Sequence, residues 1–523
     1  MSHIELFAGC GGLSLGLESV GFELVLGNEL SPMAAETYAY NFFNENLAEL
    51  AAKKQKPERV LWINSQFSNL SERLRENPQK FPPLGEVAYS DLPAEVKGFD
   101  GRLLVGSIRE LNKLLADRPE LAQALHASFG REELQLVSGG PPCQSFSMAG
   151  ARKQDCDRNT LPLDFVEFVE HTTPKFALLE NVTGILRAFS DENGQKYHAW
   201  YEVAKAFAAI GYVPLCLHVN AKYAGVAQSR PRFILIAIRR DIHTNLLQRD
   251  VLSPTSISLL QSSVAFCDRV IEQGAELEFG HLNYFDIDKS PELFRDSFLN
   301  PLIDNDTISV RDALDDLRDN GPEPTEFVHA LNDTFELLPE RPDIENHELR
   351  NNGELVRRRF RLYQVLQQID NRSVNKEVFT VLRGESESIS LDAWEQLQRF
   401  EYLNLQNEFQ KFVTSSEFIT YLKLHPTKKQ TQRALNADLP APAALSIPDD
   451  ACHYHQNELR TLTVREMARI QSFPDNFVFR SKVTTGGQMR KFEVPQYTQV
   501  GNAVPPLLGR KLGLVINSLH RLT

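Results

Sequence analysis

Short apolar runs alternate with amphipathic stretches through the first 240 residues of this 523-residue chain. This alternation is typical of a parallel β-sheet covered by helices, so the pattern predicts an α/β fold. The segment at about 45–100 is rich in charge and proline, and we expect it to be an inserted surface segment rather than core. The expected strands are residues 4–8, 22–27, 103–105, 134–137, 176–180 and 232–238.

The pattern changes at about residue 241. Strand-like runs become rare up to residue 459, acidic loop segments are common, and a basic helical patch spans residues 355–369. From residue 460 the compact pattern returns, with the amphipathic stretch "LTVREMARIQSF" and an apolar helix after "VGNAVPP". We therefore predict one α/β domain over 1–240, a smaller inserted domain over 241–459, and a C-terminal segment, 460–523, that returns to the first domain.

The composition, with 42% hydrophobic and 24% charged residues, is that of an ordinary soluble globular protein. No apolar run approaches the ~18 residues of a membrane span. The chain enters a candidate strand at once, without an export signal. Six cysteines, at positions 10, 143, 156, 216, 267 and 452, form no CxxC pair, so we expect no metal site and a reducing, cytoplasmic setting.

The net charge of −13 argues mildly against binding nucleic acid over the whole surface. A basic cleft can still form locally on an acidic protein. Charge therefore leaves nucleic acid open as a partner.

A glycine-rich turn follows the first expected strand, in "LFAGCGGLSLGL" at residues 6–17. Such a turn lets a ligand approach the backbone and directs a helix N-terminus at the ligand's polar end. The sequence "FAGCGG" is not the GxGxxG of dinucleotide-binding proteins. Glu29 ends the second strand, where an acidic residue commonly accepts ribose hydroxyls; a solvated loop carboxylate is the alternative.

Cys143 stands just after the fourth expected strand, in "VSGGPPCQSFSMAG". A free cysteine is most often a small buried hydrophobe, but here Pro141 and Pro142 fix the backbone in front of the thiol. Glu180 ends the next strand, "FALLE". Because parallel strands present their carboxyl ends at one edge, we expect Cys143 and Glu180 to border one pocket.

Gln228, Arg230 and Arg232 occupy alternate positions in "AQSRPRF", leading into the last expected strand. Alternate positions of an extended chain face one side. The alternative is an exposed strand entry whose arginines pair with nearby acids.

The motifs "FAGCGG", "PPCQSFS", "ENV", "QSRPR", "RTLTVREMARIQSFPD" and "QVGNAVPP" occur in the order and spacing of the cytosine-5 DNA methyltransferases. The chain closely resembles this family over roughly 1–44, 102–240 and 452–523. The resemblance implies a Rossmann-like class I methyltransferase domain, completed by the C-terminal segment and carrying an inserted target-recognition domain.

The resemblance also implies the chemistry. The Cys143 thiolate would attack carbon 6 of cytosine, and Glu180 would hydrogen-bond ring nitrogen 3 and the exocyclic amine. Arg232, with Arg230 beside it, would hold the carbonyl oxygen and support the carboxylate. A methyl group would pass from S-adenosylmethionine to carbon 5, leaving S-adenosylhomocysteine, on a cytosine flipped out of the duplex.

The resemblance places the cofactor on the glycine turn, with its ribose on Glu29 and its adenine near Leu30 and Ile108. Ser107 stands where the family usually has an acidic residue for the adenine amine, so we expect a weaker contact there. The full set of expected cofactor-binding residues is Phe7, Gly9, Cys10, Gly12, Glu29, Leu30, Ser107, Ile108, Pro142, Asn502, Ala503 and Val504.

The polar loop 144–161 resembles the family's mobile loop that closes on DNA beside the flipped base. Basic side chains in this loop and in the central segment are candidate phosphate contacts. The expected DNA-binding residues are Gln144, Ser147, Arg152, Lys153, Gln228, Lys428, Lys429 and Arg433.

We expect double-stranded DNA as the substrate, a monomer, no membrane association, and a cognate restriction endonuclease or other defence-system components as partners. An RNA (tRNA) cytosine-5 methyltransferase and a catalytically inactive DNA-binding regulator are the alternatives. The central segment favours reading a duplex sequence, and the cysteine, glutamate and cofactor turn are all present. The sequence does not encode which bases are read.

Overall fold

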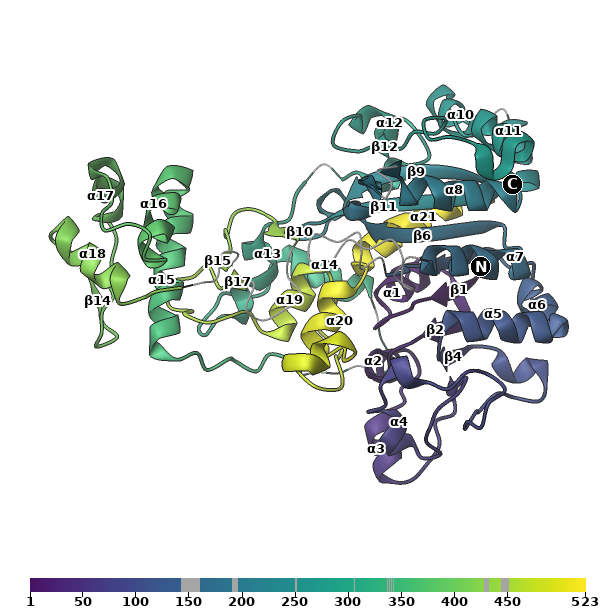
Figure 1. Ribbon diagram of the computed structural model, residues 1–523, viewed down its shortest axis with the longest axis horizontal. Helices are drawn as coiled ribbons and strands as arrows, with labels where there is room; N and C mark the ends of the chain where they lie inside the picture. The colour runs from purple at the N-terminus through teal and green to yellow at the C-terminus, as the bar shows by residue number, and fades with distance from the viewer. Residues whose placement is uncertain are drawn as a thin grey trace.

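The computed structural model describes residues 1–142, 160–190, 196–249, 252–304, 306–335, 337, 339, 341, 343–427, 432–443 and 451–523. Its centre is a nine-stranded sheet in the order β12-β9-β11-β6-β5-β1-β2-β4-β3 (Figure 1). The strands are β1 (Ser2–Leu6), β2 (Glu23–Glu29), β3 (Val60–Trp62), β4 (Arg102–Val105), β5 (Leu136–Gly139), β6 (Phe176–Val182), β9 (Tyr212–Asn220), β11 (Pro231–Arg239) and β12 (Phe285–Asp286).

Six neighbouring strands, from β3 to β6, run parallel, and β11 pairs antiparallel with both β6 and β9. The six strands predicted from apolar runs are confirmed, with ends within two residues. Because the central strands are parallel, the carboxyl ends of β1, β2, β4, β5 and β6 lie at one edge. The predicted α/β fold is confirmed.

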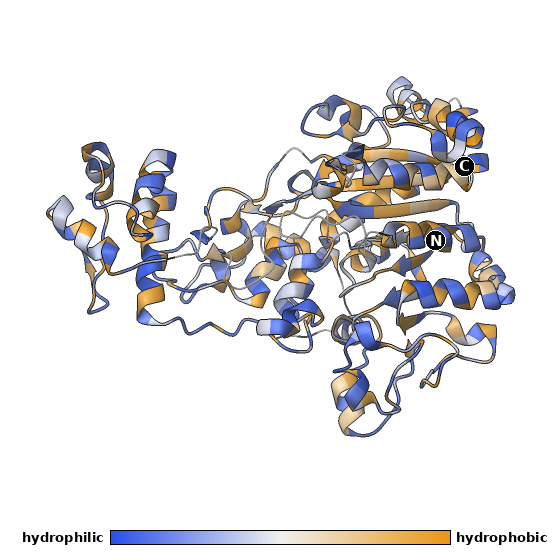
Figure 2. Ribbon diagram, viewed as in Figure 1, coloured by the Kyte–Doolittle hydropathy of each residue, from blue (hydrophilic) through white to orange (hydrophobic). Residues whose placement is uncertain are grey.

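Helices cover both faces of the sheet, and Figure 2 shows the strands between them as the most continuously hydrophobic elements. Apolar side chains of one set of helices join the sheet in one core: α5 (Ile108–Asp117), α6 (Pro119–His126), α7 (Leu161–Thr172), α8 (Ala199–Ala209) and α11 (Val264–Gln273). A second core joins the sheet to another set: α1 (Gly12–Glu18), α9 (Arg240–Leu247), α10 (Pro254–Gln261), α12 (Pro291–Arg295) and α21 (Pro506–Arg521).

We expected the segment 45–100 to be a surface insertion, but part of it is buried in the structure. It contains α3 (Leu47–Ala52), the edge strand β3 and α4 (Leu70–Arg73), beside α2 (Pro32–Phe42). Trp62 and Phe99 are fully buried, and Trp62 belongs to a core with Tyr38 of α2 and Leu103 of β4. These few buried residues stand among many charged residues and prolines, so the sequence pattern did not indicate them.

The expected boundary at residue 241 also differs from the structure. Helices α9 to α12 pack on the sheet and β12 extends it, so the chain leaves the sheet only after about residue 302. The next core joins α13 (Val310–Leu314), α14 (Glu326–Thr334), α19 (Val464–Ile470) and α20 (Gln496–Asn502) to Cys10 and Leu15.

A separate helical group lies farthest from the sheet, at the left of Figure 1. Its helices share their own core: α15 (Glu354–Ile369), α16 (Arg372–Leu382), α17 (Leu391–Leu397) and α18 (Ser415–Lys423). Short two-stranded pairs complete the fold: β7 (Phe189–Ser190) with β8 (Lys196–Tyr197), β10 (Gln228–Ser229) with β16 (Ala441–Pro442), β13 (Tyr402–Leu403) with β14 (Phe409–Gln410), and β15 (Arg433–Ala434) with β17 (Ala451–Cys452).

Among the described residues, no helix has the length and apolar character needed to cross a bilayer. The same residues contain no cluster of three His, Cys, Asp or Glu side chains suited to a metal ion.

Candidate active site

A tight turn joins β1 to α1 at the carboxyl edge of the sheet. Phe7, Gly9 and Gly11 have φ angles of 55°, 57° and 95°, in the left-handed region that glycine tolerates best. A Cβ on Gly12 would lie 2.3 Å from the carbonyl oxygen of Val504, so two backbones meet there. A Cβ on Gly9 would meet its nearest heavy atom only at 4.0 Å, so the backbone at Gly9 leaves room for a ligand.

Glu29 ties the end of β2 to this turn. One carboxylate oxygen accepts from the Gly9 amide at 2.7 Å, and the other accepts from the Ser31 amide at 2.7 Å. Burial raises the pKa of Glu29, and the amides oppose that shift. Each oxygen keeps a lone pair for a further donor, such as a ribose hydroxyl. Cys10 is 2% exposed, so the turn offers a ligand its backbone rather than this thiol.

Leu30, Ser107 and Ile108 lie just beyond the ends of β2 and β4. Leu30 is 40% exposed, whereas Ile108 is 3% exposed and belongs to the core. The Ser107 hydroxyl accepts from the Arg109 amide at 3.3 Å and so caps α5. Of these three residues, Leu30 is therefore the one that offers an exposed apolar surface. The Ser107 hydroxyl oxygen is already occupied, because it caps α5.

The residues that follow α20 face the glycine turn. Arg230 donates to the carbonyl oxygens of Gly501 and Ala503 at 2.8 and 3.0 Å. Burial lowers the pKa of Arg230, and the nearby charge of Arg232 lowers it further. Asn502 is exposed, between two residues that Arg230 fixes. We expected Arg230, beside Arg232, to help hold the carbonyl oxygen and support the carboxylate; its hydrogen bonds hold the backbone around Asn502.

Glu180, near the end of β6, forms an ion pair with Arg232, whose Nε lies 2.7 Å from Oε1. Both side chains are about one-tenth exposed. A Cβ on Gly140 would lie 3.0 Å from the other carboxylate oxygen, and Asn181 donates to the Pro141 carbonyl at 3.0 Å. The chain leaving β5 therefore runs directly against the Glu180 carboxylate.

Several predicted site residues lie outside the described residues. They are the candidate nucleophile Cys143 and the candidate DNA contacts Gln144, Ser147, Arg152, Lys153, Lys428 and Lys429. Pro142, the last described residue before Cys143, is exposed.

Of the two described DNA-contact candidates, only Arg433 is exposed. The Gln228 side chain is fully buried, and its amide donates to the Pro442 carbonyl at 3.1 Å. This differs from the predicted DNA contact, because Gln228 joins β10 to β16 and thus links the chain that leads into β11 to the central segment. The alternate spacing of Gln228, Arg230 and Arg232 in the sequence did not indicate that Gln228 would hydrogen-bond to Pro442.

Sequence reasoning missed a buried ion-pair network in the C-terminal motif. Arg460 contacts both carboxylate oxygens of Glu466 at 2.8 Å and one of Glu458 at 2.7 Å. Burial alone would raise the pKa of Glu466, but Arg460 lowers it to about 2. Glu466 also completes a capping box with Thr463 at the start of α19. The S/T-x-x-E pattern in "TVRE" was the available signal.

A second part of this network anchors α19 to its surroundings. The fully buried Arg469 pairs with Asp316 at 2.6 Å and with Asp475 at 2.7 Å. Gln471, just after α19, donates to the Val500 carbonyl at 2.6 Å. Since Val500 belongs to α20, the network positions the helix that ends at Asn502.

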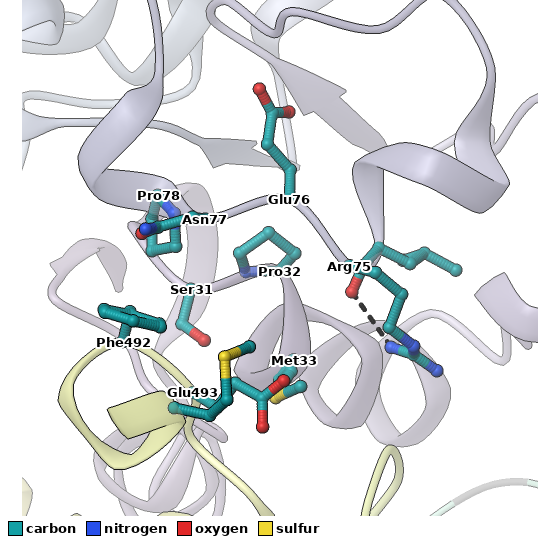
Figure 3. Close-up of a pocket in the computed structure, with 11 residues that line it drawn as sticks. Ser31, Pro32, Met33, Arg75, Glu76, Asn77, Pro78, Phe492 and Glu493 are labelled. Carbon is teal, nitrogen blue, oxygen red and sulfur yellow. Dashed lines mark hydrogen bonds between the residues drawn. The ribbon is translucent and has the colours of Figure 1, made fainter. Parts of the chain in front are cut away.

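A small cavity lies next to the Glu29 anchor, between residues 31–33, residues 74–78 and the C-terminal Met489, Phe492 and Glu493 (Figure 3). Its volume of about 30 Å³ holds about one water. A larger cavity of about 210 Å³ lies at α9 and α11, beside Val213 at the amino end of β9. That is the opposite edge of the sheet from Glu180.

A sequence model of the C-5 cytosine-specific DNA methylases matches residues 1–65 and 115–518. The type II methyltransferase M.DdeI of Desulfomicrobium norvegicum is 25% identical over 519 residues, covering 98% of this chain and 87% of that protein. M.AgeI of Thalassovita gelatinovora is 26% identical over 540 residues, covering 99% of each protein. M.NgoPII of Neisseria gonorrhoeae is 30% identical over 243 residues, covering 46% of this chain and 49% of that protein.

The family match spans both parts of the site, the glycine turn with Glu29 and the Glu180–Arg232 pair. The unmatched stretch, 66–114, includes Ser107, where the chain departs from the usual motif. The chain belongs to the C-5 cytosine-specific DNA methylases and is a DNA cytosine-5 methyltransferase.

Proposed function

We propose that this enzyme takes its methyl group from S-adenosylmethionine and that Cys143 and Glu180 direct it to carbon 5 of a cytosine flipped out of duplex DNA. One observation carries the proposal: the chain that leads to Cys143 lies against Glu180, at the sheet edge that also holds the glycine turn and Glu29. The base site and the methyl-donor site thus share one edge.

The residues at the glycine turn fit S-adenosylmethionine. Gly9 leaves open space along its backbone, the Glu29 oxygens accept ribose hydroxyls, and Leu30 offers an exposed apolar surface to adenine. Asn502, held by Arg230 through its neighbours, and Pro142 would border the methionine end of the cofactor. When bound, S-adenosylmethionine supplies an electrophilic methyl group.

Cys143 adds to carbon 6 and forms a C–S bond, which gives carbon 5 the electron density that it lacks in free cytosine. Glu180 hydrogen-bonds ring nitrogen 3 and the exocyclic amine, and Arg232 orients the carboxylate and meets the carbonyl oxygen. Once carbon 5 is methylated, it loses its proton to a base. The C–S bond then breaks and releases the product.

We propose that the enzyme is the modification half of a restriction–modification system, in keeping with the names of its relatives. It acts in the cytoplasm as a monomer on a short duplex sequence, which a companion endonuclease then leaves uncut. Arg433, with the basic residues Arg152, Lys153, Lys428 and Lys429, contacts phosphates.

The test is covalent trapping on duplex DNA in which 5-fluorocytosine replaces every cytosine, so that all target sequences are present. Fluorine on carbon 5 cannot leave as a proton does, so the C–S adduct persists through denaturing electrophoresis. We expect a cofactor-dependent adduct that Cys143→Ser abolishes and Glu180→Gln slows by about 10² or more. Cys156→Ser, the same change at the next cysteine in the sequence, is the matched control. An adduct that survives in Cys143→Ser contradicts the proposal.

A further inference from the structure

A row of side chains crosses the sheet on the face opposite Glu180. Asn181 of β6 and His218 of β9 both pair in register with Phe233 of β11, and His218 also pairs with Asp286 of β12. Residues paired across a sheet share a face, and neighbours along a strand alternate. The row therefore lies behind the strand end that carries Glu180.

Three polar side chains meet at one end of this row. The Thr183 hydroxyl lies 3.2 Å from His218 Nε2, and His218 Nδ1 lies 3.3 Å from a carboxylate oxygen of Asp286. The His218 and Asp286 side chains are only 14% and 12% exposed. The 3.3 Å approach of Nδ1 to Asp286 is an ion-pair distance without a hydrogen bond, whereas Nε2 and the Thr183 hydroxyl lie within hydrogen-bond distance of each other.

This contact reaches across a strand. In the sheet order, β11 separates β9 from β6, so His218 links two strands that are not hydrogen-bonded to each other. Thr183 begins a 3-10 turn, directly after the last residue of β6 and three residues after Glu180. The edge strand β12 is thereby connected, through one imidazole, to the turn that directly follows β6, the strand of Glu180.

The strand end is held from its other side as well. Asn181 donates to the Pro141 carbonyl, and Pro141 leads to Cys143. The segment that carries Glu180 thus has one anchor at Pro141 and another toward the sheet edge. The second anchor lies at the first residue of the turn 183–186, directly after Val182, which pairs in register with Arg232.

We propose that Asp286, His218 and Thr183 form a positioning relay for the reaction: they contact neither base nor cofactor, but they fix where Glu180 meets the flipped cytosine. This rests on the role proposed above for Glu180. A displacement of a catalytic group by a fraction of an ångström slows a reaction without weakening substrate binding.

The experiment measures the single-turnover rate of methyl transfer to plasmid DNA at saturating S-adenosylmethionine. Thr183→Val removes the hydroxyl and keeps the shape, so we expect a rate about fivefold lower, the effect of one lost hydrogen bond. Thr183→Ser restores the hydroxyl and should restore the rate to within about twofold. His218→Phe should lower the rate when introduced alone. In the Thr183→Val background it should lower the rate little further, because both substitutions remove the same Thr183–His218 contact.

Two further measurements separate positioning from a general loss of structure. The KM for S-adenosylmethionine and the Tm of Thr183→Val should match those of the wild type. Lys289, which is exposed and 3.5 Å from Asp286, provides the control: Lys289→Ala should leave the rate unchanged. A wild-type rate in Thr183→Val, or equal loss in Thr183→Ser, overturns the relay. Failure of the proposed function is distinct, since Glu180→Gln would then retain full activity.

Discussion

A buried carboxyl group underlies the glycine turn, and it makes the stability of the fold depend on pH. Glu5 of β1 is 2% exposed and contacts the hydroxyl of Ser14, which lies 3.0 Å from the hydroxyl of Tyr38. Burial raises the pKa of Glu5 from 4.5 to about 8, and the nearby acidic Glu18 and Glu29 add to the shift. Glu5 is therefore protonated at neutral pH.

The magnitude follows from the two pKa values. Below pH 4.5 Glu5 carries its proton in both folded and unfolded chains, so its contribution to stability is fully present there. As pH rises further, the unfolded chain loses this proton while the folded chain keeps it. The folded state then loses about 1.4 kcal/mol per pH unit, which amounts to ~3 kcal/mol at pH 7 and ~4 kcal/mol at pH 8, where the folded chain also begins to lose the proton.

Glu5→Gln mimics the protonated side chain and should remove this loss. We expect the variant to have a Tm close to that of the wild type at pH 5 and an increasingly higher Tm as the pH rises to 8. Thermal unfolding followed at several pH values measures the difference. Glu23→Gln, at an exposed position of β2, is the matched control. A Tm difference that does not grow with pH would refute the reasoning.

Two further predictions concern packing around the site. Gly12→Ala would place a methyl group 2.3 Å from the Val504 carbonyl; we expect at least a tenfold weaker affinity for S-adenosylmethionine by calorimetry, and an unchanged affinity would contradict the close approach. Arg469→Met would leave Asp316 and Asp475 without their buried partner; we expect a loss of about 3–5 kcal/mol in unfolding free energy, and an unchanged denaturation midpoint would exclude that role.

The parallel part of the sheet is predictable because its strands are continuous apolar runs between turns. Strand β9, "YVPLCLHVN", was missed because Pro214 and His218 interrupt its apolar pattern. In the structure β12 pairs only with Leu217 and His218, so Pro214 lies where the outer edge of β9 is not covered by β12. Strand β3 has three residues inside a charged segment, and only its burial reveals it.

The positions of the two acidic candidates were predictable because they depend on strand ends. Glu29 and Glu180 follow apolar runs, and the parallel topology brings both to one edge. The contacts that hold the backbone around Asn502 and the turn after Glu180 were not predictable, because they join distant segments. Arg230 binds carbonyls 271 and 273 residues away, and the Thr183–His218 contact requires the register of three strands.

The central claim is that this chain methylates cytosine in DNA through Cys143. The most direct measurement is bisulfite sequencing of DNA from cells that express the protein, beside cells that express Cys143→Ala. We predict cytosines protected from conversion within one short sequence, and full conversion of the same positions in the variant. Protection that persists in Cys143→Ala, or its absence from DNA in cells with the wild-type protein, would contradict the account.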